Sequence, residues 1–130
     1  RDQSILDNGE CFEALEKLKQ DGKIRAIGMS TKTVSGALNA MKICDVLMVT
    51  YNPSAQEDEI VIDTAYDNGC GILIKKAFNS GHAVVSGEKA SVSKNLEFAL
   101  SRPGVSSVII GTINPSHLKD NTAAARNLAR

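Results

Sequence analysis

The sequence has 130 residues, of which 42% are hydrophobic and 23% are charged, and its formal net charge at pH 7 is zero. This composition is typical of a folded globular domain and excludes a largely disordered chain. The lack of a basic excess argues against nucleic acid or an anionic membrane as a partner, and no apolar run approaches the roughly 20 residues that a membrane-spanning helix needs.

Helices and strands are expected to alternate along the whole chain. Phe12, Leu15 and Leu18 recur at helical spacing and predict a helix over residues 10–21, which Gly22 ends. Apolar runs and turn residues then predict, in chain order, a strand over 24–30, a helix over 33–44 with Ile43 on its inward side, a strand over 46–51, a helix over 57–68, a strand over 71–78, a loop over 79–90, a helix from Ser91 or Ser93 to about 101, a strand over 105–111, and a last helix with Asn114 as N-cap and Pro115 as its first residue.

This order predicts an α/β fold with a parallel sheet. Regular alternation of helix and strand favours parallel strands joined by right-handed crossovers. The strands over 46–51, 71–78 and 105–111 are apolar without alternation, which is typical of strands covered on both faces. Two architectures remain open at this point, an open doubly wound sheet and part of a (β/α)8 barrel, of which four strands would make half.

Cysteine and histidine usage bounds the chemistry. The three cysteines, Cys11, Cys44 and Cys70, are odd in number and lack C-x-x-C spacing, which predicts free thiols and a cytoplasmic protein. His82 and His117 lie far apart and neither has a cysteine nearby, so we expect no zinc site. The sequence opens on arginine, and we expect residues 1–130 to form a single partial domain of a longer protein.

Polar, small and aromatic residues follow the apolar strands, where parallel α/β folds bind their ligands. Gly111 would let a ligand approach the backbone, Thr112 offers a hydroxyl, and the helix that begins after Asn114 directs N–H groups and a positive dipole end toward an anion. The alternative is that these residues only make a tight turn. Alternation would also turn one of Lys75 and Lys76 toward the barrel interior, where a buried lysine needs a partner or ligand. The alternative is that both lysines lie at the strand end and reach solvent.

Four stretches together resemble the C-terminal half of the aldo-keto reductase family. They are GKIRAIGMST, VLMVTYNP, GILIKKAFNSGHA and PGVSSVIIGTINPSHLKDNTAAA, and the resemblance runs from about Phe12 to Ala125. It implies strands five to eight of a (β/α)8 barrel and the cofactor-binding part of an NADP(H)-dependent reductase of aldehydes, ketones or sugars. The family's catalytic Asp, Tyr, Lys and His belong to strands one to four, so we expect this chain to lack them and not to reduce carbonyls by itself.

The resemblance also implies a set of cofactor contacts. Ser30 matches the serine that hydrogen-bonds the nicotinamide carboxamide, Gly111 and Thr112 match the loop around the 2′-phosphate, and His117 falls where many members have an arginine. Two residues further along match those that contact the adenine. The implied cofactor-binding residues are Ser30, Lys75, Phe78, Gly111, Thr112, Asn114, His117, Asp120 and Asn121.

The chain also departs from the family pattern. Thr31 replaces an asparagine, Met48 replaces a glutamine, and Lys75 falls where an aromatic side chain usually stacks on the nicotinamide. A lysine would be repelled by the positively charged oxidised ring. The usual basic residue is absent at Gly111, so the preference for NADP over NAD is open.

Two other functions stay open. One is a catalytically inactive half-barrel that binds nucleotide or self-associates through its exposed strand edges. The other is a sugar-phosphate enzyme with a phosphate site after its last strands.

Overall fold

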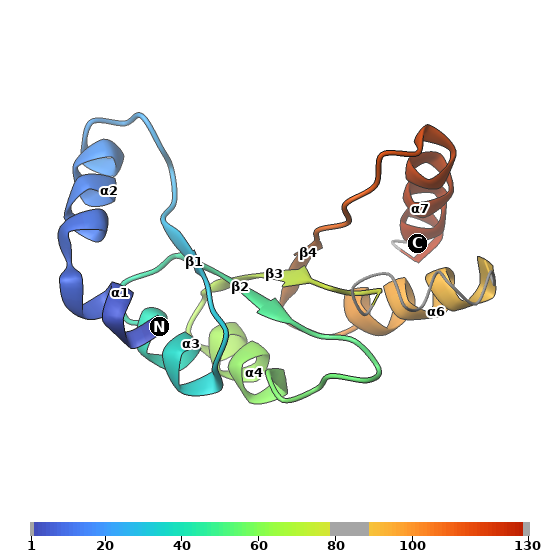
Figure 1. The fold of residues 1–130 in the computed structure, drawn as a ribbon, viewed down its shortest axis with the longest axis horizontal. Helices are drawn as coiled ribbons and strands as arrows, with labels where there is room; N and C mark the ends of the chain where they lie inside the picture. Colours follow the sequence, from blue (N-terminus) through green and yellow to red (C-terminus); the bar gives the residue numbers. More distant parts are fainter. Residues whose placement is uncertain (1, 79–88, 129–130) are drawn as a thin grey trace.

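The structure is a computed structural model that describes residues 2–78 and 89–128. Helices and strands alternate after an initial pair of helices (Figure 1). In chain order the elements are α1 (Asp2–Asn8), α2 (Glu10–Gln20), β1 (Gly28–Ser30), α3 (Val34–Ala40), β2 (Val46–Thr50), α4 (Glu59–Asp67), β3 (Gly71–Lys75), α6 (Lys89–Leu100), β4 (Val105–Val108) and α7 (Pro115–Leu128). Among the described residues, no helix is long and apolar enough to cross a bilayer.

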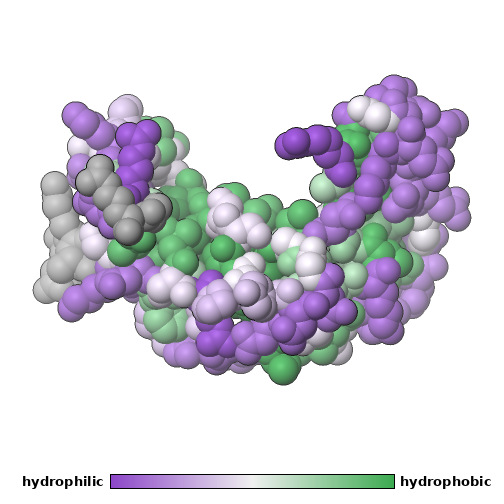
Figure 2. Space-filling view, turned by 180° about the vertical axis from the view of Figure 1, so that it is seen from behind, coloured by the Kyte–Doolittle hydropathy of each residue, from purple (hydrophilic) through white to green (hydrophobic). Residues whose placement is uncertain are grey.

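The four strands form one sheet in the order β1-β2-β3-β4, and every pair is parallel. Successive strands are therefore neighbours, and a helix follows each of them, which confirms the parallel α/β prediction. Helices α3 and α4 lie below the sheet in Figure 1, whereas α2 and α7 rise at its two ends like arms. Apolar surface gathers in the middle between these arms, whose own surfaces are mostly hydrophilic (Figure 2).

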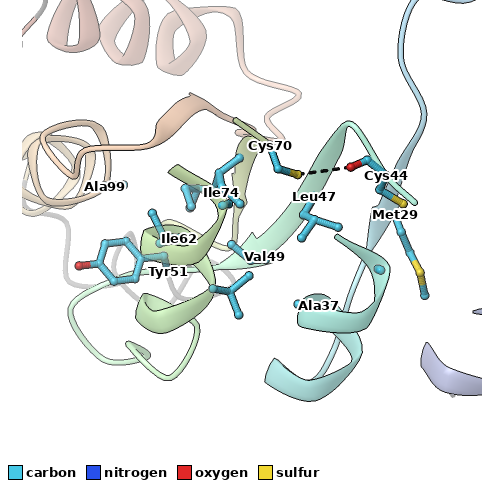
Figure 3. Close-up of a cluster of buried hydrophobic side chains, with 14 of the residues drawn as sticks. Met29, Ala37, Cys44, Leu47, Val49, Tyr51, Ile62, Cys70, Ile74 and Ala99 are labelled. Atoms are coloured by element: carbon cyan, nitrogen blue, oxygen red, sulfur yellow. Dashed lines mark hydrogen bonds between the residues drawn. The ribbon is translucent and has the colours of Figure 1, made fainter. Parts of the chain in front are cut away.

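One face of the sheet carries the core. Leu47, Val49, Ile72 and Ile74 are fully buried against small and branched residues of α3 and α4, such as Ala37 (Figure 3). Burying side chains of this size stabilises the fold by about 1.5–3 kcal/mol each. The apolar strand residues that sequence alone placed in the interior therefore do form the core.

The opposite face is only half-buried, which corrects the expectation of strands covered on both faces. Burial alternates along β2 and β3, so that every second residue is only partly covered. These half-buried positions are Val46, Met48, Thr50, Gly71, Leu73 and Lys75. We call this side the open face. It is the side that a barrel would turn inward.

The strands are shorter than predicted because pairing with the neighbouring strand sets their ends. Gly28 pairs with Val46, the first residue of β2, so residues 24–27 have no strand beside them. Ile27 instead accepts hydrogen bonds from the backbone N–H groups of Asp45 and Val46. Strand β3 stops before Lys76, whose φ of 58° lies in the left-handed region. Strand β4 ends at Val108 rather than at residue 111.

The observed helices differ from those predicted from the sequence in four places. Helix α1 was not predicted at all. Thr33 caps α3, its hydroxyl accepting the N–H of Gly36, but the helix ends at Ala40, and Ile43 beyond it is exposed rather than inward. Helix α2 keeps its predicted bounds to within one residue, yet none of its residues is buried. Helix α6 begins at Lys89, earlier than the predicted serine caps, and the rest of the predicted loop lies outside the described residues.

Candidate functional site

Two residues predicted to bind cofactor meet on the open face at the carboxyl ends of the strands. Nζ of Lys75 donates to Oγ of Ser30 at 2.9 Å and to the backbone oxygen of Thr31 at 2.5 Å. Strand register explains the contact: Ser30 lies beside Met48, Met48 lies beside Leu73, and Lys75 follows two residues later on the same face. The lysine side chain therefore crosses β2 to reach β1.

The Lys75 ammonium is held by neutral oxygen atoms. Partial burial lowers the pKa of Lys75, and the charge of Lys76 adds to this, whereas Asp58 and Asp2 act in the opposite direction. None of the ion pairs between described residues includes Lys75. A buried lysine is expected to need a partner or ligand, and the structure supplies two partners, the Ser30 hydroxyl and the Thr31 backbone carbonyl.

The end of β2 has a structural role. The Tyr51 ring is buried and stacks on Phe98 of α6, with ring centroids 4.8 Å apart, and burial raises the pKa of its hydroxyl. The buried amide of Asn52 donates to the backbone oxygen of Lys76 at 2.9 Å and accepts the N–H of Ser54. Tyr51 and Asn52 thus fasten the end of β2 to α6 and to the backbone of Lys76, and Tyr51 belongs to the core rather than to the open face.

Asp2 is a residue near the site that sequence analysis missed. One of its carboxylate oxygens accepts the N–H groups of Lys32 and Thr33, at 2.8 and 2.9 Å, and the Thr33 hydroxyl at 3.0 Å. Burial alone would raise the pKa of Asp2, but these hydrogen bonds outweigh burial and hold it below its ordinary value. The contact spans 30 residues, and no local pattern signals it.

Thr31, the residue that follows β1, is a further unusual feature at the carboxyl ends of the strands. Its side chain is 1% exposed, and its hydroxyl has no hydrogen-bond partner among the described residues. A buried hydroxyl without a partner is unfavourable by about 1–3 kcal/mol. Thr31 nevertheless continues the ladder, since its N–H donates to the backbone oxygen of Met48 at 3.1 Å.

The turn after β4 uses its own polar groups to open α7. Oγ1 of Thr112 accepts the N–H of Asn114 at 3.2 Å, and Oδ1 of Asn114 accepts the N–H of Ser116 at 2.9 Å. This geometry matches the predicted N-cap with Pro115 at the first helical position. The same hydrogen bonds are also those expected if these residues only make a tight turn. Gly111 is exposed, and a Cβ built on it would meet nothing within 4 Å, so its backbone is open to a ligand.

The remaining predicted residues lie further along or elsewhere. His117 and Asp120 are exposed and Asn121 is half-buried, all on the first turns of α7. Phe78 is half-buried and packs against the core. His82 lies outside the described residues. The structure thus brings Ser30 and Lys75 into contact, and groups most of the other predicted residues around the start of α7.

The chemistry of these residues suits a nucleotide better than a metal. In the part of the chain that the structure describes, no three His, Cys, Asp or Glu side chains gather as metal ligands. The strand ends instead offer a hydroxyl, an ammonium and, at Gly111, unobstructed backbone. Hydroxyl and backbone donors recognise amides and phosphates.

Comparison with known proteins gives a consistent answer. The model of the aldo/keto reductase family matches residues 4–91. Two solved structures described as aldo-keto reductases from Pseudomonas aeruginosa are each 40% identical and match the whole chain, with TM-scores of 0.86 and 0.84. The chain covers 49% and 48% of theirs, so it spans about half their length. A search of curated proteins found no match.

Four parallel strands with their helices, over half the length of these relatives, agree with half of a (β/α)8 barrel. The family match, the similarity of the whole chain to the solved structures and the parallel fold all support one assignment. The chain belongs to the aldo/keto reductase family.

Proposed function

We propose that this chain is the C-terminal, cofactor-binding part of an NADP(H)-dependent aldo-keto reductase that acts on aldehydes, ketones or sugars. The observation that carries the proposal is the contact between Lys75 and Ser30 at the carboxyl ends of parallel strands, in a chain of this family. Ligands of parallel α/β folds bind at that edge.

The residues present suit the two ends of the cofactor. The Ser30 hydroxyl would hold the nicotinamide carboxamide, because it lies on the open face beside an ammonium. The turn at Gly111 would take the phosphate end, because its backbone is unobstructed and the α7 dipole favours negative charge. When bound, the cofactor supplies the hydride for a carbonyl carbon.

The proton for the carbonyl oxygen would come from outside this chain. Tyr51 could supply one by chemistry, but it is 3% exposed and stacked on Phe98, away from the open face. The family's catalytic tyrosine would be contributed by the half of the barrel that this sequence does not include. The chain's own role would be to bind and orient cofactor beside a small-molecule carbonyl substrate.

Titration of the full gene product with NADPH and NADH tests the proposal. We expect saturable quenching or enhancement of the cofactor's fluorescence, and binding about tenfold weaker in Ser30→Ala, the loss expected for one hydrogen bond. Ser35→Ala, an exposed helix serine, is the matched control and should bind as the wild type does. A gene product that binds neither nucleotide at millimolar concentration would rule the proposal out.

A catalytically inactive half-barrel that self-associates or binds nucleotide is the second candidate. It is favoured by the half-buried open face and by the outer strands β1 and β4, each of which pairs with a single strand among the described residues. Such edges and faces invite pairing with a second copy. A dimer by light scattering, together with no turnover of aldehydes, ketones or sugars, would favour this candidate; a monomeric particle with NADPH-dependent turnover would favour the reductase.

A further inference from the structure

Lys75 places an ammonium on the open face without a carboxylate beside it. Two of its three N–H groups are used by Ser30 and Thr31. The third has no acceptor assigned among the described residues. Asp58 and Asp2 are near enough to influence the ammonium, but neither forms an ion pair with it. A single positive charge is thus held at a fixed point of the candidate site.

We propose that Lys75 makes the site discriminate between the two redox states of its cofactor, favouring the neutral reduced nicotinamide over the cationic oxidised one. The inference rests on the proposed function, in which Ser30 holds the carboxamide. A ring fixed by the Ser30 hydroxyl lies within one side-chain contact of the Lys75 ammonium, because both groups share that hydroxyl.

The physical basis is the charge difference between two ligands of nearly equal shape. The oxidised ring carries a positive charge that the reduced ring lacks, so contacts that depend on shape contribute similarly to both. Repulsion between two positive charges a few ångströms apart weakens only the oxidised form. Screening by salt is incomplete because Lys75 is half-buried.

The structure offers a matched control in the next residue. Lys76 carries the same charge, but it is exposed and follows the end of β3, with a left-handed φ of 58°. Its ammonium forms no hydrogen bond with the site among the described residues. Removing the Lys76 charge should therefore leave the discrimination unchanged.

One functional consequence follows. A site that binds the reduced cofactor more tightly loads it readily and releases the oxidised product, which favours reduction of carbonyls over oxidation of alcohols. Lys75 would act as a specificity-determining residue, since it changes the relative affinity for the two cofactor forms.

The test is calorimetric titration of the full gene product with NADPH and with NADP⁺. We expect the ratio of the dissociation constant of NADP⁺ to that of NADPH to fall by about tenfold in Lys75→Met, because one charge–charge repulsion that weakens NADP⁺ binding is removed. Lys75→Arg keeps the positive charge and should retain the wild-type ratio, and Lys76→Met should not alter it. Lys75→Gln provides a second neutral variant, and circular dichroism checks that each variant is folded.

The outcomes separate the two proposals. If wild type binds both forms and the neutral variants keep its ratio, Lys75 does not discriminate and this inference is wrong while the proposed function stands. If wild type binds neither form, the proposed function is wrong and this inference falls with it. A ratio that falls in both Lys75→Met and Lys76→Met would also overturn it, since the effect would then reflect overall charge.

Discussion

Arg102, in the turn between α6 and β4, forms an ion pair with Asp63 of α4. Its Nη2 donates to both carboxylate oxygens of Asp63, at 2.6 and 2.7 Å, and its Nη1 pairs with Glu59 at 2.5 Å. Both acidic residues lie on α4, so a single guanidinium fastens the last crossover to the helix beneath β3. The hydrogen bonds that Arg102 donates to Asp63, together with the negative charges of Asp63 and Glu59, raise the pKa of Arg102 and keep it charged.

Replacing this guanidinium should destabilise the fold modestly. We expect Arg102→Met to lower the free energy of unfolding by about 1 kcal/mol, because both carboxylates are substantially solvent-exposed and the pairs are screened. Urea denaturation measures the change. The control is Lys23→Met, which removes an exposed pair with Asp21 at 3.3 Å and should leave stability unchanged. Equal effects of the two substitutions would contradict a special role for Arg102.

The Asp2 carboxylate makes stability depend on pH in the acid range. Three hydrogen bonds from Lys32 and Thr33 favour its charged form, and they hold its pKa below the ordinary 3.8 despite burial. The unfolded chain therefore binds a proton at a higher pH than the folded chain does. The stabilisation is complete above about pH 4–5 and declines as pH falls through the folded pKa.

Substitution of Asp2 should remove this dependence. We expect Asp2→Ala to lower the free energy of unfolding at pH 7 by about 1–3 kcal/mol, because the partly buried N–H groups of Lys32 and Thr33 lose their charged acceptor. The difference from wild type should narrow between pH 5 and pH 3. Thermal unfolding across this range is the measurement, with Asp7→Ala, an exposed aspartate of the same helix, as control. A difference that stays constant with pH would show that the carboxylate's charge does not stabilise the fold.

Local patterns were enough to predict the order of elements but not their ends. Strands of branched residues such as Val49 and Ile72 are recognisable because few other environments suit such runs. A strand's end depends on what lies beside it, and that is set by the neighbouring chain segment. Residues 24–27 read as strand, yet β2 begins opposite Gly28 and leaves them unpaired. Helix α3 stops at Ala40 for reasons that its own spacing does not show.

In the candidate site too, features set by local sequence could be predicted, whereas contacts between distant segments could not. Asn114 and Pro115 were predicted as a helix start because capping is a local property. Ser30 and Lys75 were predicted separately, but their contact joins residues 45 apart and depends on sheet register. Asp2 was missed entirely, since its acceptor role exists only once α1 packs beside the start of α3.

The three cysteines should differ in reactivity. Burial raises the pKa of Cys44 to about 11 and also raises that of Cys70, whereas Cys11 is exposed. At pH 8 a thiol of pKa 11 is about one part in a thousand thiolate, and the thiolate is the reactive form. We expect Ellman's reagent to label Cys11 quickly in the native protein and all three thiols in urea. Cys11→Ser should abolish the rapid phase; a second fast thiol in that variant would contradict the burial of the pair.

Two glycines with positive φ separate backbone strain from steric clash. Gly104, with φ of 90°, lies against α4: a Cβ there would be 3.0 Å from Cβ of Tyr66 and 3.2 Å from the backbone oxygen of Ile62. Gly22, with φ of 70°, has nothing within 4 Å of such a Cβ. We expect Gly22→Ala to destabilise the protein by about 1 kcal/mol through backbone strain alone, and Gly104→Ala by about 2–3 kcal/mol because clash adds to strain. Urea denaturation compares them, and equal losses would mean that the turn at Gly104 moves away from α4 without cost.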